Sequence, residues 1–407
     1  MPDRILIIVT IGAQQRIYFT AFISALCLNA LSPIIPDLSH EFTLSRMEGL
    51  VRIGGLNNLL LYLPMGLISL GCAIWSDRFQ IRISLLNGIL VGVFAFLALV
   101  GNAPLFATGY LILGGLLGLV IPGLYAAARR IPEASGFQLS ININIVIGIG
   151  MAVGQYASAT IADYVSWRFV YALLSLLHLV GWPVIHRVDS SRTRGATQFN
   201  FSRVSGSAWL LLSQYLPGSI PWGGIGVFIF SYLELECGIR KSLAVLLVTA
   251  LGIGMIAGSF LAGRAGARMA NRDTRIVPML IIVFFLSSIG VVQGLIHLSP
   301  TVPFLGLLPM YFAAGLVLSV PGTYIKGLLF EATSERDVQA VFSLENFLES
   351  LGKGFGPFAV ALLIQAVADL RSGMILALYS WLLCIPPILI LLFSRGGNDR
   401  EETRLKA

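Results

Sequence analysis

Long apolar stretches alternate with short charged segments along the whole chain. No charged residue occurs between Leu56 and Ile74, and none occurs between Ile83 and Ala128. A run of about 18 or more mostly apolar residues predicts a helix that crosses a membrane, so the chain has room for about twelve spans. The predicted spans cover residues up to 36, 48–72, 83–100, 105–128, 137–161 and 169–185, and then 208–232, 242–261, 276–296, 304–330, 338–366 and 374–393.

The longest polar stretch lies near the middle of the chain. Residues 187–207 carry Arg187, Arg192, Arg194 and Arg203. This segment predicts a linker between two helical bundles, 1–186 and 208–394, and a polar tail follows at 395–407. No small-residue cleavage site follows the apolar stretch near the start, so we expect an uncleaved first span rather than a signal peptide. The predicted fold is all-α, with two pseudo-symmetric six-helix bundles.

Composition places the chain in a membrane. It is 56% hydrophobic and 12% charged, whereas a soluble domain has about 25% charged residues. The net charge of +7 does not predict nucleic-acid binding, because the basic residues lie at the ends of the spans. If both termini are cytoplasmic, most Lys and Arg residues face the cytoplasm. The exceptions include Arg46, Arg168, Arg240, Lys241 and Arg371. We therefore expect cytoplasmic termini, in the inner membrane of a bacterium.

A charged loop separates the second and third predicted spans. It contains a small residue, Ala73, followed by Asp77-Arg78 and then Arg82. This spacing resembles the loop signature of the major facilitator superfamily of secondary transporters. The resemblance implies twelve spans in two bundles, alternating access, and a substrate site near the midplane. It also implies that Asp77, Arg78 and Arg82 form a gating loop, in which Asp77 binds the helix start near 338–340.

The two halves of the chain carry related motifs. A weaker copy of the loop pattern occurs at 259–268, with Arg264 and Arg268 but without the acidic residue. Ile121-Pro122-Gly123-x-Tyr125 recurs as Val320-Pro321-Gly322-x-Tyr324. The matching order favours an internal duplication, as is common in transporters. The alternative is that Gly and Pro are simply frequent in membrane helices.

The predicted span 338–366 contains charged residues near its centre. Glu345, Glu349 and Lys353 are spaced four residues apart, which places them on one face of a helix. A charge at the centre of a membrane costs about 2.5–3.5 kcal/mol on insertion scales. We therefore expect these residues to face a cavity as a substrate or coupling site. The alternative is a Glu349–Lys353 pair that only packs the bundle.

Three further polar residues are candidate ligands of the substrate. Lys326 follows the Pro321-Gly322 pair and lies well away from the centre of its span. It either extends to the cytoplasm or binds a substrate anion. Asn142 and Asn144 offer neutral polar contacts, although such residues also join helices to one another.

The span 208–232 is predicted to be broken. Pro217, Pro221 and Trp222 lie in a glycine-rich stretch, and Pro disrupts helical hydrogen bonding. The Pro-Trp-Gly sequence, followed by Tyr232-Leu233, resembles the spinster-like branch of the superfamily. Members of that branch move lysophospholipids or sphingolipid-like amphiphiles, which implies an amphiphilic solute.

We expect the protein to be a secondary transporter of a small organic or amphiphilic solute, anionic or lysolipid-like. One alternative is a proton-coupled exporter of drug-like compounds, and another is a polytopic lipid-modifying enzyme or receptor. No phosphate-binding Gly-x-x-x-x-Gly-Lys-[Ser/Thr] loop occurs, so ATP is not the expected energy source. The expected partners are the solute, protons and the bilayer. We expect no nucleic acid, cofactor or metal, no enzymatic activity, and a monomer.

Overall fold

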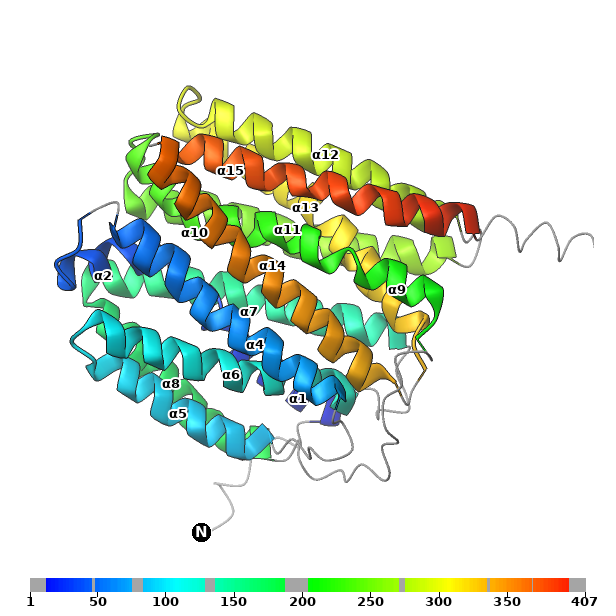
Figure 1. The fold of residues 1–407 in the computed structure, drawn as a ribbon, viewed down its shortest axis with the longest axis horizontal. Coiled ribbons are helices and arrows are strands. Elements are labelled where there is room, and N and C mark those ends of the chain that lie inside the picture. Colours follow the sequence, from blue (N-terminus) through cyan, green and yellow to red (C-terminus); the bar gives the residue numbers. More distant parts are fainter. Residues whose placement is uncertain are drawn as a thin grey trace, which may run out of the picture.

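A computed structural model describes residues 12–45, 48–74, 83–128, 136–186, 204–270, 275–334, 337–367 and 369–394. Every regular element within these ranges is a helix (Figure 1). Ten helices among the described residues are long and apolar enough to cross a membrane, and 83–99 forms a shorter apolar helix. The predicted all-α integral membrane fold is confirmed.

In the first half, the helices pack in pairs. Helix α4 packs against α6, α5 against α8, and α1 against α7. The elements are α1 (Ala13–Ala25), η1 (Ser32–Ile34), α2 (Ile35–Glu41), η2 (Gly49–Leu56), α4 (Asn57–Ile74), α5 (Ile83–Leu99), α6 (Ala103–Ala128), α7 (Gly136–Tyr164) and α8 (Trp167–Ile185).

In the second half, the same order of pairs recurs. Helix α10 packs against α14, α11 against α13, and α12 against η5 and α15. The elements are α9 (Gly206–Leu212), α10 (Tyr215–Leu235), α11 (Lys241–Ala270), α12 (Ile276–Leu298), α13 (Phe304–Glu331), α14 (Val338–Val367), α15 (Leu370–Leu378) and η5 (Tyr379–Cys384). The α1–α7 pair thus corresponds to α10–α14, and the α4–α6 pair to α11–α13. This repetition is the pseudo-symmetry that the sequence motifs predict.

Equivalent glycines allow the paired helices to approach each other closely. A Cβ atom on Gly154 of α7 would collide with the carbonyl of Leu26, at the end of the first helix. A Cβ atom on Gly356 of α14 would collide with the carbonyl of Ile220 in α10. Small residues at helix contacts are the usual basis of tight packing in membranes.

The two halves meet along two further helix pairs. Helix α4 packs against α14, and α7 packs against α11. Figure 1 shows α4 (blue) and α14 (orange) running side by side through the middle of the molecule. The side-chain amide of Asn346 donates a 2.6 Å hydrogen bond to Ser69 Oγ, which itself donates to the Gly118 carbonyl at 2.7 Å.

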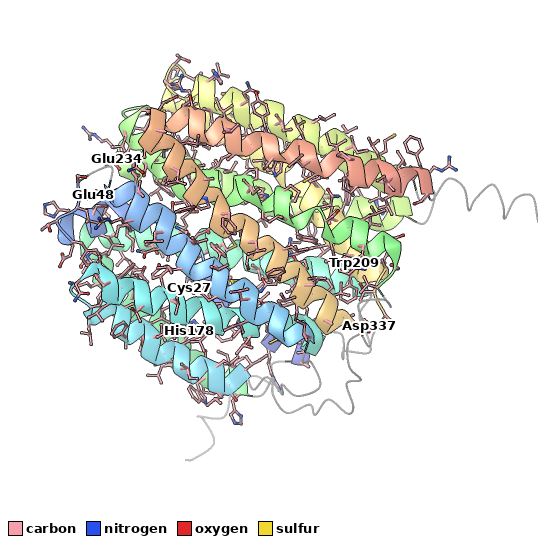
Figure 2. The ribbon with its side chains drawn as sticks, in the orientation of Figure 1. Cys27, Glu48, His178, Trp209, Glu234 and Asp337 are labelled. Atoms are coloured by element: carbon pink, nitrogen blue, oxygen red, sulfur yellow. The ribbon has the colours of Figure 1, made fainter. Side chains whose placement is uncertain are left out.

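The helices define two ends of the molecule. We call the end where α8 finishes and α9 begins the linker side, and the opposite end the distal side. Asp337 and Trp209 lie at the linker side, whereas Glu48 and Glu234 lie at the distal side (Figure 2). Helices α13 and α14 therefore place Lys326 and Glu345 nearer the linker side, and Lys353 near the middle of α14.

The first and last predicted spans are interrupted. Helix α1 ends at Ala25, and turns lead to η1 and α2. Pro33 and Pro36 lie in these two short elements, and because proline has no N–H group, the preceding turn of a continuous helix would lose hydrogen bonds. In the last span, the 3₁₀ segment η5 separates α15 from the terminal helix, just before Pro386-Pro387.

The break in the seventh span lies earlier than predicted. The regular α-helix is interrupted by a turn at Ser213 and Gln214, whose backbone angles stay helical, and α10 then continues through Pro221 and Trp222. Pro217 occupies the first turn of α10, where proline is tolerated. Pro221 cannot donate to the Pro217 carbonyl, but Ser380 Oγ donates to it at 2.9 Å. The indole N–H of Trp381 donates to the neighbouring Gly218 carbonyl at 2.8 Å.

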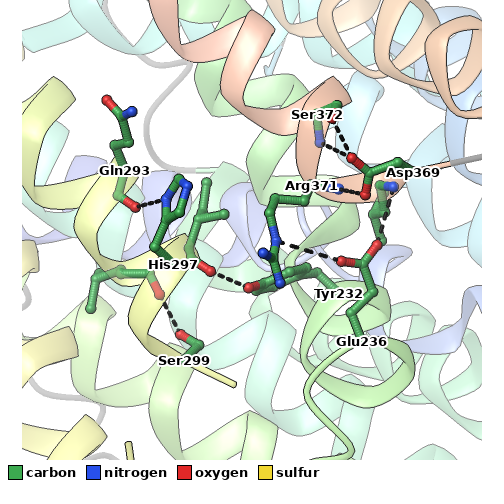
Figure 3. A network of polar contacts seen from close by, with 11 residues as sticks. Tyr232, Glu236, Gln293, His297, Ser299, Asp369, Arg371 and Ser372 are labelled. Atoms are coloured by element: carbon green, nitrogen blue, oxygen red, sulfur yellow. Dashed lines mark hydrogen bonds and ion pairs between the residues drawn. The ribbon is translucent and has the colours of Figure 1, made fainter. Parts of the chain in front are cut away.

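A polar network joins three helix ends at the distal side of the second half (Figure 3). The Tyr232 hydroxyl donates to the Ile296 carbonyl, which links α10 to α12. Glu236 accepts a 3.1 Å hydrogen bond from the backbone of Leu370 and lies 4.0 Å from the Arg371 guanidinium. Asp369 caps the first turn of α15. The network therefore holds α10, α12 and α15 together.

The predicted gating loop lies outside the described residues. This applies to Asp77, Arg78 and Arg82. The described part of the structure does include their expected binding partner, because α14 begins at Val338. The contact between Asp77 and this helix start stays a prediction.

Candidate substrate-binding site

A cavity of about 350 Å³ lies between the two halves. Its walls come from the turn after α1 and from α4, α6 and α7 on one side, and from α10, α11, α12, α13, α14 and η5 on the other. Most lining side chains are apolar. Charged side chains line it on the second half alone, within the described residues: Lys326, Glu345, Glu349 and Lys353.

The four charged residues form a continuous cluster. Lys326 Nζ lies 3.4 Å from Glu345 Oε1 and 3.8 Å from Glu349 Oε2. Lys353 Nζ donates a 2.5 Å hydrogen bond to Glu349 Oε1, one helical turn away in α14. With all four groups ionised, the cluster is neutral. Glu349 is the central member because it contacts both lysines.

Lys326 also connects the cluster to the first half. Its ammonium group donates a 2.9 Å hydrogen bond to Asn144 Oδ1 in α7. It lies 5.8 Å from the ring centre of Tyr125, and Lys353 Nζ lies 6.0 Å from that of Tyr62. Both rings belong to the first half, so aromatic faces in α6 and α4 support the two ammonium charges.

The two carboxylates differ in their environment. The Glu345 side chain is 2% exposed, whereas that of Glu349 is 22% exposed. Glu345 lies near one lysine, and its Oε1 has no hydrogen-bond partner among the described residues. Burying an ion is costly unless it is paired and hydrogen-bonded. Glu345 is therefore the least satisfied charge of the cluster.

Further buried polar atoms border the cavity without hydrogen-bond partners among the described residues. They are Gln214 Oε1, the Tyr215 hydroxyl, Ser288 Oγ and Ser350 Oγ. Buried polar atoms in proteins are normally hydrogen-bonded, to water or a ligand where no protein group is available. These atoms, together with Glu345 Oε1, can accept hydrogen bonds from a solute or water, and the three hydroxyl groups can also donate.

Aromatic rings pack at the linker-side ends of the helices that carry the cluster. Tyr125 of α6 stacks on Phe342 of α14 with ring centres 4.5 Å apart, and Phe330 of α13 lies 5.7 Å from Phe342. All three side chains are fully buried. The stack joins the first half to the second near the linker side.

The structure brings most of the predicted site residues together. Glu345, Glu349, Lys353, Lys326 and Asn144 meet at one wall of the cavity. Their roles stay predictions.

Asn142 is separate from that wall. Its side chain bonds to the Tyr18 hydroxyl at 3.1 Å and does not line the cavity. Pro221 and Trp222 line the cavity, whereas Pro217 does not.

Two features of the site were not apparent from sequence. Lys326 does not stand alone, because it pairs with Glu345 and Glu349 of the next helix. A pattern in the sequence did indicate this pairing. The span 338–366 has two acidic residues but only one basic residue at its centre, so a second basic residue is expected nearby. The aromatic partners Tyr62 and Tyr125 had no such signal.

Comparisons with known proteins place the chain in a family. Residues 17–357 match the sequence profile of the Major Facilitator Superfamily. The protein AraJ of Escherichia coli (strain K12) is 22% identical over 280 residues, which is 62% of this chain and 66% of the relative, just under two thirds of its length.

Solved structures share the fold. The human organic anion transporter MFSD10 superposes with a TM-score of 0.71 at 13% identity, covering 92% of this chain and 98% of that one. A bacterial homologue of the human lysosomal transporter Spinster, in an inward-facing conformation, has a TM-score of 0.66 at 14% identity, covering 95% and 97%. Because the family profile matches residues 17–357, the chain belongs to the major facilitator superfamily of secondary transporters.

Proposed function

We propose that the protein transports a small organic anion by alternating access, with proton coupling. The observation that carries this proposal is the cluster of Lys326, Glu345, Glu349 and Lys353 on the wall of the cavity between the halves. A charged cluster at membrane depth is costly and is typically retained for binding or proton transfer.

The two lysines on the cavity wall support an anionic solute. Among the described residues, the polar side chains that the first half offers to the cavity are all uncharged: Asn29, Ser32, Asn58, Tyr62, Asn144, Gln155 and Tyr156. A charged group on the solute must therefore be neutralised by the second half. Lys326 and Lys353 both reach the cavity and can bind a carboxylate, sulfonate or phosphate. The structural relative described as an organic anion transporter is consistent with this choice.

Glu345 is the proposed proton site. Protonation would remove a buried and incompletely hydrogen-bonded negative charge. Lys326 would then carry excess positive charge and attract the anion. Loss of the proton would restore the Lys326–Glu345 pair and release the anion. Proton and anion are thus expected to bind together, which is the basis of symport.

Alternating access requires the contacts between the halves to break. We propose that 1–186 and 208–394 move as two bodies and that the Lys326–Asn144 and Asn346–Ser69 hydrogen bonds close the linker side. Asp77, with Arg78 and Arg82, would add a contact at the start of α14. Asp77→Asn should then reduce transport while leaving the amount of protein in the membrane unchanged, and normal transport would exclude this loop from the mechanism.

We further propose that the linker side faces the cytoplasm of a bacterium. The distribution of Lys and Arg supports this orientation. Alkaline phosphatase or a fluorescent protein can be fused to each terminus. Phosphatase activity and fluorescence should then place both termini in the cytoplasm. A terminus on the outside would reverse the assignment of the two sides.

Transport in proteoliposomes tests the proposed function. Carboxylates and sulfonates should accumulate when a pH gradient drives protons in the same direction, and a lipophilic cation should not. In Glu345→Gln, the pH gradient should no longer accelerate transport, whereas exchange of anions across the membrane should continue. Glu48→Gln, at the distal surface, is the matched control. Transport of the cation alone would favour the exporter of drug-like compounds, and gradient-driven transport by Glu345→Gln would exclude Glu345 as the proton site.

A further inference from the structure

Two glycines lie next to the hydrogen bond between Lys326 and Asn144. Gly322 precedes Lys326 by four residues in α13, and Gly148 follows Asn144 by four residues in α7. Residues four apart lie on the same face of a helix. Helix α7 runs from the linker side to the distal side, and α13 runs in the opposite direction. Both glycines therefore lie one helical turn further towards the distal side than the hydrogen bond.

Open space lies in front of both glycines. Gly148 and Gly322 line the cavity between the halves. A Cβ atom added to either residue would meet no side chain and no backbone of a neighbouring helix within 4 Å. Gly322 is exposed and Gly148 is half-buried, so both can be reached from the cavity. The cavity is therefore open at the level of these two residues.

Close packing of helices does not explain this pair of glycines. Elsewhere in the same two helices, glycine permits tight contact. A Cβ atom on Gly154 of α7 or on Gly315 of α13 would lie 1.9 Å or 2.1 Å from a backbone oxygen of another helical segment. Gly148 and Gly322 have no such neighbour, although glycine lowers the stability of a helix. Their structural effect is to keep the cavity open beside Lys326.

Lys326 has donor capacity left for a ligand in this open space. An ammonium group can donate three hydrogen bonds. Lys326 Nζ donates one to Asn144 at 2.9 Å, and its carboxylate neighbours lie further away, at 3.4 and 3.8 Å. The side chain is 11% exposed and lines the cavity. An anion beside the two glycines can therefore contact Lys326 without displacing a helix.

We propose that Gly148 and Gly322 determine the size of the anion that reaches Lys326. The acidic group of the solute and the atoms directly attached to it occupy the open space beside the two glycines, close to the backbone of α7 and α13. The inference rests on the proposed function for the presence of an anion at the charged cluster. It adds two specificity-determining residues, which act through the absence of a side chain.

Binding of two sulfonates to the purified protein in lipid nanodiscs tests the proposal. Propane-1-sulfonate has an unbranched chain next to the sulfur atom, whereas benzenesulfonate has a ring there, and both are permanently charged. The wild type should bind both. Gly322→Ala should weaken the binding of benzenesulfonate more than that of propane-1-sulfonate, because a methyl group occupies part of the space beside the acidic group. Gly148→Leu and Gly322→Leu should weaken the binding of both by about tenfold or more.

Gly290→Leu is the matched control. Gly290 lies within α12 and is exposed, and an added Cβ atom would also meet nothing within 4 Å, but this residue does not line the cavity. The substitution raises helix propensity in the same way, and both affinities should stay within about twofold of the wild type. Thermal unfolding establishes that each variant is folded, and Gly148→Ala and Gly322→Ala decide the question if a Leu variant is not.

The possible outcomes distinguish the size limit from the anion site itself. A loss of affinity in Gly322→Ala that is larger for benzenesulfonate, with wild-type affinities in Gly290→Leu, supports the size limit. Wild-type affinities in the Ala and Leu variants of both cavity glycines overturn it. Equal losses for the two sulfonates in Gly322→Ala also overturn it, because they indicate a displaced Lys326. In either case, loss of binding in Lys326→Met would still support the anion site. Absence of binding of both sulfonates by the wild type overturns the anion proposal, and the size limit with it.

Discussion

Lys326 of α13 donates a 2.9 Å hydrogen bond to Asn144 of α7, and this bond joins the two halves of the protein beside the charged cluster. Lys326 also lies within 3.4 Å of Glu345 and 3.8 Å of Glu349. A single ammonium group therefore connects the proposed solute and proton site to a contact between the halves. Any change in the charge around Lys326 is expected to change the strength of that contact.

Removing Asn144, the acceptor of the Lys326 hydrogen bond, should favour opening of the linker side. Asn144→Ala leaves Lys326 paired within its own half but without a partner in α7. We expect faster solute exchange from the linker side and a loss of stability of about 1 kcal/mol or less. Exchange rates in proteoliposomes and thermal unfolding measure both effects.

Asn142→Ala is the matched control, because Asn142 bonds to Tyr18 within the first half. A change of equal size in exchange rate in the two variants would contradict a specific role for the Lys326–Asn144 contact.

Neutralising both Glu349 and Lys353 should destabilise the protein less than neutralising either residue alone. Glu349→Gln or Lys353→Met alone leaves a charge without its closest partner, which costs about 3–5 kcal/mol for a buried pair. The double variant removes both charges and should unfold at a higher temperature than either single variant. If the pair serves the proposed anion site, the double variant should be folded but unable to transport.

Glu48 and Arg52 provide a comparison with the same four-residue spacing. Their atoms lie 3.9 Å apart and both side chains are largely exposed. Neutralising them, singly or together, should have no measurable effect on thermal unfolding because exposed pairs contribute little. If the double variant Glu349→Gln, Lys353→Met transports like the wild type, the buried pair contributes only to packing.

Ser380 should stabilise the continuous helix α10. Ser380→Ala leaves the Pro217 carbonyl without the hydrogen bond that replaces the one Pro221 cannot make. The expected loss is about 1 kcal/mol, seen as a lower unfolding temperature. Ser394→Ala removes a hydroxyl that bonds only within its own helix. Equal losses in the two variants would show that the bond to Pro217 has no special importance.

Asp369 should make stability depend on pH. Hydrogen bonds from the Ser372 side chain and backbone and the Arg371 backbone hold the pKa of this carboxyl below its usual value, despite partial burial. Because the pKa is lower in the folded state, the contribution of Asp369 is fully present above the unfolded-state pKa. It is lost as pH falls through the folded-state pKa.

Two substitutions separate capping from titration. Asp369→Ala should lower the unfolding temperature at neutral pH, by an amount that corresponds to about 1 kcal/mol. The difference from the wild type should vanish on acidification. Asp369→Asn keeps a capping oxygen that does not titrate, so its difference from the wild type should be smaller at neutral pH. If the unfolding temperatures of Asp369→Ala and the wild type differ by the same amount at every pH, titration of Asp369 does not contribute to stability.

Local sequence was sufficient for the spans and for one ion pair. A helix within lipid satisfies its own backbone hydrogen bonds, so a long apolar run such as that in α6 determines its own structure. The Glu349–Lys353 contact also follows from local geometry, because residues four apart lie on the same face of a helix. The proline-rich segments were less predictable. The interruption near Ser213 precedes Pro217, and α10 passes through Pro221 without a break.

Contacts between distant segments were decided by tertiary structure alone. Lys326 and Asn144 are 182 residues apart, and Ser380 and Pro217 are 163 residues apart. The apolar pattern shows that each span is buried in a membrane but not which helices face one another, since lipid and neighbouring helices are equally apolar. The partners of Lys326 depend on that choice of neighbours. The sequence by itself determined helices and a charged face, and only their packing determined what that face contacts.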